Sequence, residues 1–397
     1  MTRRLRILRV LPFFGAAFGG PVAQAQRVHR ELLARGHEVK LLSSDLGLAS
    51  TIARDTWHER DGVQCFFARV AGLGAQPPYC VPRAAQLALR EALAHVDVAT
   101  LNVGLSLWGT WLAKSAAKAR VPFVYNAEGA LDPVRLRVKR LQKQLFLRCC
   151  ERRVLRRAAA IQAVTAAEAD AIVQQGALRE RIHVIPNGVL LPPAPVAESV
   201  AQLRERGRER LSVPRDAFVI LFFGRLHDLK GIDLLLAAAA PLLGGQRDVR
   251  LAIVGPEDGV GAALQRQAQA LGVQRHVVFH RGVGEGGKAE VFAAADVFAL
   301  TSRSEGLPNA ALEAAAAGLP LLVSEDCHLP EVAEFEAGTI CSLEVPTITA
   351  ALARFRDEAA FTQRCGEGAR RMAAARFELG HVVDRLETLY LGLPARE

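Results

Sequence analysis

The sequence has few aromatic residues, no paired cysteine pattern and no long apolar run, and each shortage excludes a class of protein. Phe, Trp and Tyr make up 6% of the 397 residues. No apolar run approaches the roughly 20 residues that a membrane-spanning helix needs. The seven cysteines have no paired spacing, and Cys149 and Cys150 are adjacent. This usage favours reduced thiols in a cytosolic protein over a disulfide framework.

Two ligand signatures are also missing. His276 and His280 would lie on the same side of a strand, but neither Cys nor an acidic residue stands beside them at ligand spacing, so we predict no metal site. The stretch FFGAAFGGPVAQ lacks a proper G-x-G-x-x-G, and Ser43 and Ser44 replace the acid expected after the second strand. Both features argue against a dinucleotide-binding dehydrogenase.

The length and the pattern of apolar runs predict two α/β domains. A chain of 397 residues exceeds one ordinary core and favours about two domains. Short apolar runs alternate with helical patterns, which is typical of right-handed βαβ units and parallel sheets. The predicted strands are RILRVLPF, EVKLLSS, DVATLNV and PFVYNAEG in the first block, and FVILFFGRL, VRLAIVGPE, HVVFHRGV, DVFALTSR and LPLLVSED from residue 218 onward. The predicted fold is therefore two doubly wound, Rossmann-like domains.

The stretch IPNGVLLPPAPVAES, rich in Pro and Gly, separates the two blocks. It predicts an N-terminal domain over residues 1–187, a linker over 188–212 and a C-terminal domain over 213–372. A last helix over 373–397 could pack on either domain, which includes crossing back to the first.

The start of the chain allows two interpretations. MTRRLRILRVLPFFGAAFGGPVAQAQ resembles a secretory signal, but Arg9 interrupts its apolar stretch. The following residues supply an amphipathic helix, a turn at Gly36 and a second strand. We therefore interpret the region as a first βαβ unit. Its Gly19 and Gly20 precede the helix, where their backbone can approach phosphates or an acceptor; a tight turn without a ligand is the alternative.

The net charge of +9 is unevenly distributed. Residues 1–190 hold 28 Lys and Arg against 14 Asp and Glu, while the remainder holds 22 against 27. Ten of these cations and a single acid, Glu151, lie within residues 134–157, whose apolar positions recur at helical spacing: Val134, Val138, Leu141, Leu145 and Cys149. A basic amphipathic helix fits an anionic membrane or glycolipid. A core-packed helix with a solvated basic face is the alternative, and nucleic acid is disfavoured because aromatic residues and binding motifs are lacking.

Ligands of open parallel sheets bind at the carboxyl ends of the strands, and loops of the second block carry suitable residues there. GRLHDLKG follows a strand with Gly224, Arg225 and Lys230, so that both cations can reach one pyrophosphate. Two solvated cations beside a turn are the alternative. In HLPEVAE, Glu331 begins a helix, where a capping role is the default.

The stretch TSRSEGLPNAALEAAAAGLP places two acids around a helix start. Pro308 suits the first helical turn, so the helix is predicted to begin near residues 307–309. Backbone N–H groups from Gly306 onward and the helix dipole attract an anion or hydroxyl groups. Glu305 can accept hydrogen bonds from a ligand, and Glu313, eight residues on, can hold another part of it. An acid near the dipole and an incidental mid-helix acid are the alternative.

In this order and spacing, the three motifs resemble the C-terminal domain of GT-B glycosyltransferases, specifically the retaining glycosyltransferase family 4. Glu305 and Glu313 match the E-x7-E signature of that family. IPNGV before the linker and GHEV near the start also fit, so the resemblance covers nearly the whole chain.

The resemblance implies a UDP- or GDP-sugar donor in a cleft between two facing domains. It assigns the diphosphate to Arg225 and Lys230, the hexose to Glu305 and the ribose to Glu313. Fixed cationic donors stabilise a departing diphosphate, and no D-x-D pair follows a strand, so no metal or other cofactor is expected. The predicted donor-binding residues are Gly19, Gly20, Gly224, Gly306, Leu307, Pro308, Asn309, Glu313 and Glu331.

The first block departs from the family at one position. VPFVYNAEGALDP matches the region where many relatives carry a PHG segment, and Glu128 stands in place of the His. We predict Glu128 as a catalytic residue, although the role of the His cannot be transferred to it; a satisfied loop acid is the alternative. Asn126, and Asn102 in LNVGLSLWG, are predicted on the acceptor side.

The resulting prediction is a retaining, metal-independent hexosyltransferase. It would act on a glycan or glycolipid acceptor in cell-surface polysaccharide or lipopolysaccharide-type biosynthesis, in the cytoplasm or at the inner face of the membrane. Two alternatives remain on the same architecture: a nucleotide-sugar 2-epimerase and a non-catalytic sugar-nucleotide-binding partner.

Overall fold

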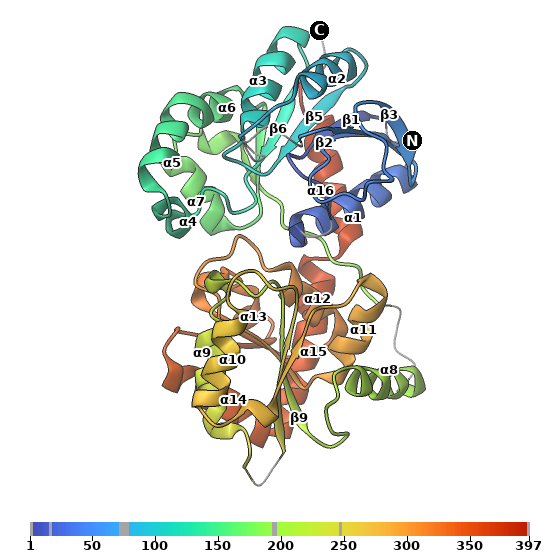
Figure 1. Cartoon of the computed structure of the whole chain (residues 1–397). Coiled ribbons are helices and arrows are strands. Elements are labelled where there is room, and N and C mark those ends of the chain that lie inside the picture. The colour runs from blue at the N-terminus through green and yellow to red at the C-terminus, as the bar shows by residue number, and fades with distance from the viewer. Residues whose placement is uncertain (1–2, 16–17, 71–78, 193–196, 246–247, 395–397) are drawn as a thin grey trace. The chain divides into compact units, whose positions relative to one another are not determined.

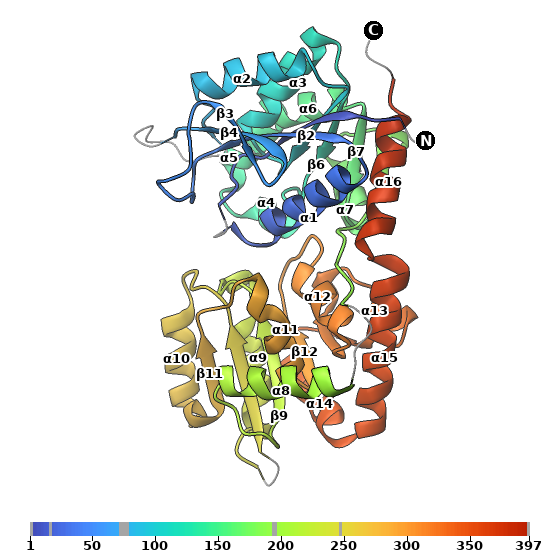
Figure 2. The same ribbon diagram turned by 90° about the vertical axis from the view of Figure 1, so that its right-hand side faces the viewer.

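The computed structural model describes residues 3–15, 18–70, 79–192, 197–245 and 248–394 and contains two compact units (Figures 1 and 2). Unit 1 comprises Met1–Gly188 together with Leu379–Glu397, and unit 2 comprises Val189–Glu378. Each unit is a mainly parallel sheet with helices on both faces, as predicted for two Rossmann-like domains.

Unit 1 contains an eight-stranded sheet in the order β3-β4-β2-β1-β5-β6-β7-β8. All neighbouring strands are parallel except β3 and β4, which are antiparallel. The strands are β1 (Arg6–Val10), β2 (Glu38–Ser44), β3 (Trp57–Arg60), β4 (Val63–Ala68), β5 (Val98–Asn102), β6 (Phe123–Asn126), β7 (Ala160–Ala163) and β8 (Ile182–Val184). The helices are α1 (Gly20–Ala34), α2 (Arg83–Leu93), α3 (Leu107–Ala119), α4 (Pro133–Arg137), α5 (Arg140–Phe146), the π-helical turn η2 (Leu147–Glu151), α6 (Arg152–Arg157), α7 (Ala166–Gln174), the 3₁₀ turn η3 (Arg179–Arg181) and α16 (Leu379–Leu391).

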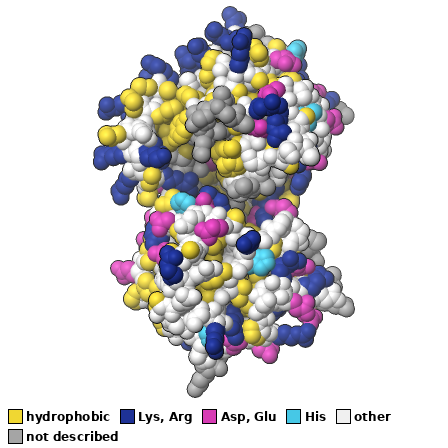
Figure 3. Space-filling model, in the orientation of Figure 1, with side chains coloured by type: hydrophobic (Ala, Val, Ile, Leu, Met, Phe, Trp, Pro, Cys, Tyr) yellow, Lys and Arg dark blue, Asp and Glu magenta, His cyan; other side chains and the backbone are white. Residues whose placement is uncertain are grey.

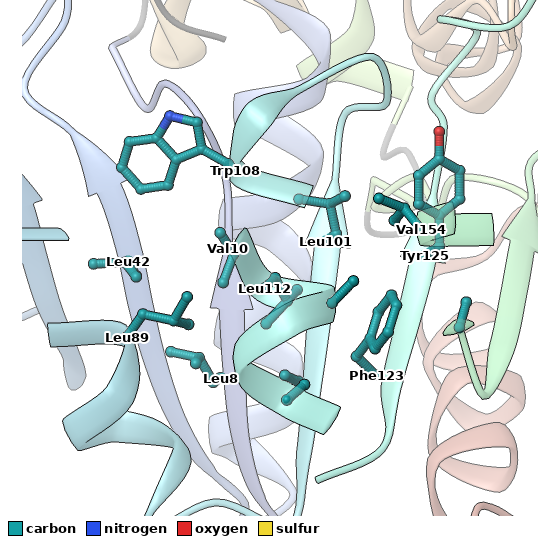
Figure 4. Packing of buried hydrophobic residues seen from close by; sticks show 14 of the residues in the cluster. Leu8, Val10, Leu42, Leu89, Leu101, Trp108, Leu112, Phe123, Tyr125 and Val154 are labelled. Carbon is teal, nitrogen blue, oxygen red and sulfur yellow. The ribbon is translucent and has the colours of Figure 1, made fainter. Parts of the chain in front are cut away.

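Both faces of the unit 1 sheet are covered by apolar layers. Successive side chains of a strand point to opposite faces, so Leu8 of β1 packs with α2 and α3, while Ile7 packs with α1 and α16. Figure 4 shows part of the first layer, in which Leu89 and Leu112 approach Leu8 from the helices. Burial on both faces explains why these strands are continuous apolar runs in the sequence.

Unit 2 contains a six-stranded, fully parallel sheet in the order β11-β10-β9-β12-β13-β14. The strands are β9 (Phe218–Phe223), β10 (Val249–Val254), β11 (Val277–His280), β12 (Val297–Leu300), β13 (Leu321–Ser324) and β14 (Gly338–Cys341). The α-helices are α8 (Ala197–Arg210), α9 (Ile232–Ala239), α10 (Gly261–Ala270), α11 (Glu285–Ala294), α12 (Asn309–Ala317), α13 (Glu331–Glu334), α14 (Val345–Asp357) and α15 (Ala359–Arg376). The 3₁₀ turns are η4 (Asp228–Lys230), η5 (Ala240–Leu242), η6 (Gln274–His276) and η7 (Glu325–Cys327).

The predicted linker over residues 188–212 differs from the structure, because much of it forms helix α8 of unit 2. Arg204 and Arg208 both pair with Asp296, at N–O distances of 2.6 and 3.1 Å. A Cβ atom at Gly207 would overlap the backbone of Glu290 in α11, so the two helices lie in close contact. Residues 193–196 of the predicted linker lie outside the described residues.

The end of the chain returns to unit 1. Helix α15 ends at Arg376 in unit 2, and α16 then packs beside α1. Leu379, Val383 and Leu386 of α16 are buried in the layer that contains Ile7. Residues 373–397 are therefore not one helix, because a break separates α15 from α16. Within the described part of the chain, every helix is too short or too polar to span a bilayer.

Replacement of Leu386 by Ala is expected to destabilise unit 1. The side chain is 3% exposed, and removal of a buried Leu typically costs about 2–5 kcal/mol. All three tryptophans, Trp57, Trp108 and Trp111, belong to unit 1, so their fluorescence in a urea titration reports its unfolding. Thr388→Ala, on the exposed face of the same helix, is the control, and equal effects of the two changes would contradict the assignment of α16 to this core.

Candidate functional site

The loops after β9 and β12 flank the point where the strand order of unit 2 reverses. Strand β9 lies between β10 and β12, so the connections that leave its two sides run in opposite directions. Ligands of open α/β sheets bind at such points, beyond the carboxyl ends of the strands. The predicted residues from Gly224 to Lys230 and from Glu305 to Asn309 occupy these two loops and the helix start that follows.

Lys230 and Glu305 form an ion pair between these loops. The Nζ atom of Lys230 donates to Oε1 of Glu305 at 2.5 Å, and the Ser302 hydroxyl donates to the same oxygen at 2.7 Å. Glu305 is 5% exposed, and a carboxylate that is so deeply buried requires partners of this kind. The structure thus joins one of the two predicted cations to the first acid of the E-x7-E motif.

The two loops are fixed to each other through their backbones. Gly231 has φ 61° and lies so close to Thr301 that a Cβ atom would overlap its carbonyl oxygen. The Thr301 hydroxyl donates to the Gly231 carbonyl at 2.8 Å, and Arg303 pairs with Asp233 at 2.6 Å. These contacts hold Lys230 and Glu305 in place before any ligand binds.

Glu313 is paired with a residue that the sequence did not single out. Helix α12 begins at Asn309 after Pro308, as predicted. One and a half turns on, Glu313 accepts from Lys288 of α11, at distances of 3.1 and 3.2 Å to its two oxygens. The Lys288 ammonium also lies 5.9 Å from the centre of the Phe223 ring. Lys288 has no sequence motif of its own, and only the packing of α11 beside α12 reveals it.

Arg225 is exposed and pairs with Asp258 rather than with the acids of the motif. Its Nη1 donates to Asp258 at 2.6 Å, and Asp258 belongs to the loop after β10. Gly224 and Gly255 lie in close backbone contact, which brings these two loops together. Among the described residues, no hydrogen bond or ion pair joins Arg225 to Glu305, and the shared pyrophosphate site of Arg225 and Lys230 stays a prediction.

Glu331 begins α13, as predicted, after the loop that follows β13. Burial raises the pKa of its carboxyl group. The same loop reaches the site through its backbone, because the Asp326 carbonyl accepts from the Glu305 N–H at 3.1 Å. No hydrogen bond that the structure describes joins Glu331 to Lys230 or Glu305.

Asn102, Asn126 and Glu128 converge in unit 1, at the carboxyl ends of β5 and β6. The Asn102 amide donates to Oε1 of Glu128 at 3.3 Å, and the Glu128 N–H donates to the Asn126 side chain at 3.1 Å. Arg9 of β1, which the sequence showed only as an interruption of an apolar run, donates to the Asn102 oxygen at 3.2 Å. Its Nε and Nη1 atoms are buried and have no partner among the described residues.

Glu128 has an unusual backbone and an unusual acidity. Its φ of 49° lies in the left-handed region, which few non-glycine residues adopt. Burial raises the pKa of its carboxyl group to about 7, against the opposing effects of Asn102 and Arg9. A carboxyl group with such a pKa can both accept and release a proton near neutral pH.

Gly19 and Gly20 stand at the start of α1. Gly19 has φ 67° and ψ −129°, and nothing lies within 4 Å of the position of a Cβ atom. The backbone conformation of Gly19, and not a lack of space, therefore explains why a glycine stands at this position. Residues 16–17, directly before them, lie outside the described residues.

The segment 134–157 is not the continuous helix that its spacing predicts. Lys139, with φ 53°, separates α4 from α5. The apolar stripe faces outward: Val138, Leu141 and Leu145 are 58%, 82% and 65% exposed. Figure 3 shows hydrophobic and basic side chains mixed over the region of α4 and α5. The core-packed alternative therefore fails for Leu141 and Leu145.

A cavity of about 460 Å³ in unit 2 lies away from the predicted residues. Phe218, which begins β9, and Pro320, which precedes β13, contribute to its lining. It is therefore at the amino ends of the strands, opposite the loops that carry Lys230 and Glu305. The lining contains acids, Asp296 and Glu367, as well as arginines. Because both signs of charge are present, the lining does not indicate a class of ligand.

Comparison with known proteins gives matches over most of the chain. Residues 204–372 match the family described as glycosyl transferases group 1, and residues 19–188 match the glycosyl transferase 4-like domain. D-inositol 3-phosphate glycosyltransferase of Streptomyces avermitilis is 36% identical over 53% of this chain and 47% of that protein. The same enzyme of Geodermatophilus obscurus is 32% identical over 75% of this chain and 66% of that protein. The chain thus matches about half the length of the first curated relatives.

Solved structures share the fold. Anabaena HepE in complex with UDP-glucose has a TM-score of 0.76 at 20% identity, over 98% of this chain and 100% of that chain. Sucrose-phosphate synthase from Thermosynechococcus elongatus has a TM-score of 0.74 at 19% identity, over 97% and 98% of the two chains. At these identities the likeness shows the GT-B fold alone.

The raised pKa of Glu128 is expected to make stability depend on pH. Between its ordinary value of 4.5 and about 7, the unfolded chain has lost the proton that the folded chain retains. Stability should therefore fall as pH rises through this window. Glu128→Gln, whose amide stays neutral, should flatten the fall, as measured by urea unfolding at pH 5, 6, 7 and 8. Parallel curves for the two proteins would refute the shift.

Proposed function

Because the chain belongs to the group 1 glycosyl transferases and has the GT-B fold, we propose that it moves a hexose from a UDP- or GDP-sugar to an acceptor with retention of anomeric configuration. The observation that carries this proposal is the Lys230–Glu305 pair at the carboxyl ends of β9 and β12. It places a cation and a hydrogen-bond acceptor together, and a sugar diphosphate needs both.

The donor would lie along unit 2, with its hexose, diphosphate and ribose each bound by different residues. Glu305 would accept from hexose hydroxyl groups, and the backbone from Gly306 and Leu307 into α12 would supply donors. Lys230 would exchange part of its contact with Glu305 for the diphosphate. Glu313, held by Lys288, would bind the ribose. The complex of the structural neighbour HepE with UDP-glucose supports a nucleotide sugar as ligand class.

Bond cleavage would then depend on the cations. The bond between the anomeric carbon and the diphosphate breaks, and negative charge grows on the leaving group. Lys230 and Arg225 would stabilise that charge, as fixed cations do most effectively where little reorganisation is needed. The proposal includes a reaction without a metal, because Lys230 and Arg225 would supply the positive charge that a metal ion supplies elsewhere.

The acceptor is proposed to be anionic and to bind unit 1. Residues 1–190 carry twice as many basic as acidic residues, and the curated relatives are named for D-inositol 3-phosphate. Glycans and glycolipids with phosphate groups, as in cell-surface polysaccharide or lipopolysaccharide-type biosynthesis, share this charge. Glu128, half protonated near neutral pH, would steer the acceptor hydroxyl.

Lys230→Met should lower turnover at least 100-fold, since removal of one charge-stabilising donor typically costs about 10²–10³. Glu305→Gln should also lower turnover, because it removes the charge of the proposed acceptor for the hexose hydroxyl groups. The assay measures nucleoside diphosphate release from UDP-glucose and GDP-mannose, with D-inositol 3-phosphate or a lipopolysaccharide core as acceptor. Arg266→Ala, on the exposed face of α10, is the matched control and should change turnover less than twofold. Donor that is converted to its 2-epimer without an acceptor would instead support the epimerase.

A second surface is proposed to bind an anionic membrane. Leu141 and Leu145 project from α5, and the segment 134–157 that contains it carries ten Lys and Arg against one acid. Burial of each Leu in the acyl boundary is worth about 1.5–3 kcal/mol, and each nearby cation adds about 1 kcal/mol on an anionic leaflet. Together with seven free cysteines, this supports a place at the cytoplasmic face of a membrane.

Leu141→Ser and Leu145→Ser should each weaken binding to vesicles of phosphatidylcholine and phosphatidylglycerol at least tenfold. Leu87→Ser provides the control, because Leu87 is an exposed leucine of α2 outside the basic segment. Sedimentation with vesicles measures the binding, which should also fall as salt rises. Equal binding to pure phosphatidylcholine would rule out the anionic surface.

A further inference from the structure

The basic segment 134–157 contains one acid, Glu151, and this residue is buried although the apolar stripe of the same segment is exposed. Glu151 closes the π-helical turn η2 and is 0% exposed. Leu147, one turn earlier, is also buried, so this segment presents one face to the interior and the opposite face to solvent. π-helical turns are rare and occur frequently at functional sites. A buried carboxyl group among ten cations needs an explanation other than surface charge.

Glu151 binds the backbone of the loop that follows β5. Its Oε1 atom accepts from the Leu105 N–H at 2.9 Å and from the hydroxyl group of Tyr125. Burial raises the pKa of the Glu151 carboxyl, while hydrogen bonds from Tyr125 and from the Leu105 and Ser106 backbones lower it. In Figure 4, the Tyr125 hydroxyl points away from Phe123.

The loop that Glu151 holds has a strained backbone. Val103 and Leu105 have φ values of 81° and 54°, and a β-branched residue such as Val is an outlier in that region. Between them, Gly104 leaves no room for a Cβ atom, which would overlap the Tyr125 hydroxyl. Strained residues persist only where the surrounding structure fixes them, and they cluster at functional sites.

The same loop is joined to both predicted acceptor residues. It begins directly after Asn102, whose amide contacts Glu128. The N–H groups of Val103 and Gly104 donate to the carbonyls of Asn126 and Ala127, at 3.1 and 3.2 Å. The loop and the segment that leads to Glu128 are therefore one hydrogen-bonded unit.

We propose that Glu151 is a positioning residue, which fixes the loop of residues 103–106 and through it the contact between Asn102 and Glu128. It touches neither residue and would not touch a substrate. Tyr125 completes the arrangement by orienting the carboxyl group toward the loop. The functional part of this inference rests on the proposed transfer reaction, but the structural part does not.

Hydrogen exchange of the whole protein tests the structural part. In Glu151→Leu, the amides of Leu105 and Ser106 should exchange at least tenfold faster than in the wild type, because their acceptor is removed. Glu151→Gln keeps an acceptor oxygen and should rescue most of the protection. Tyr125→Phe, which removes a single hydroxyl group, should give an intermediate rate and provides a second test if Glu151→Leu does not fold.

Two internal controls accompany the exchange measurement. Glu91→Leu removes an exposed acid of α2 and should leave the loop unchanged, and peptides of unit 2 should exchange alike in all variants. If Leu105 exchanges within twofold of the wild-type rate in both Glu151→Leu and Tyr125→Phe, the inference is overturned.

Kinetics separate positioning from a general loss of stability. Glu151→Leu should lower kcat/KM for the acceptor at least tenfold, while the shift of melting temperature that UDP-glucose produces stays unchanged, since the donor contacts proposed for Lys230, Glu305 and Glu313 belong to unit 2. Equal losses for donor and acceptor would contradict a positioning role. If the wild type transfers no sugar from any donor, the proposed function fails, and the exchange rates still decide the role of Glu151.

Discussion

The ion pair between Lys230 and Glu305 is the constraint on which the candidate site depends. A carboxylate as buried as Glu305 is costly without a partner, and loss of one member of such a pair leaves the other charge uncompensated. The loops after β9 and β12 are accordingly fixed to each other by Gly231, Thr301 and the Arg303–Asp233 pair. Each charge thus compensates the other.

The two units hold their key carboxyl groups in different ways. Glu305 has a cation at 2.5 Å, whereas Glu128 has an amide at 3.3 Å and an arginine that contacts only that amide. Burial raises the pKa of Glu128 to about 7, because these two partners oppose the shift only in part. Carboxyl groups in contrasting environments take contrasting roles in enzymes. Here the first suits hydrogen bonding to hydroxyl groups, and the second suits exchange of a proton.

Features with a local cause were predictable from the sequence. Every named strand formed, because burial on both faces leaves an unbroken apolar run, and α12 began where Pro308 indicated. Strands β3, β4, β7, β8 and β14 were not named. Length alone does not explain this, because β4 has six residues and the named strands β6, β11, β12 and β13 have four. Ion pairs between distant segments were also missed. Lys288 and Asp258 belong to no motif, and only helix and loop packing brings them to Glu313 and Arg225.

The local pattern also failed to predict the boundaries of two helical segments. Spacing alone made 134–157 one helix, but Lys139 adopts a left-handed backbone and divides it. The prolines of the segment 188–212 predicted a linker. In the structure, Arg204 and Arg208 of its helical part form ion pairs with Asp296. In the second case, contacts remote in sequence outweigh the local pattern.

The return of α16 to unit 1 has a consequence for synthesis on the ribosome. Unit 1 lacks the helix that packs with Ile7 and Val28 until residues 379–391 have emerged. All of unit 2 is translated before that point, and domains generally fold as units during synthesis. The second unit can thus reach its native state while the first, although it emerged earlier, still has one apolar face that α1 covers only in part.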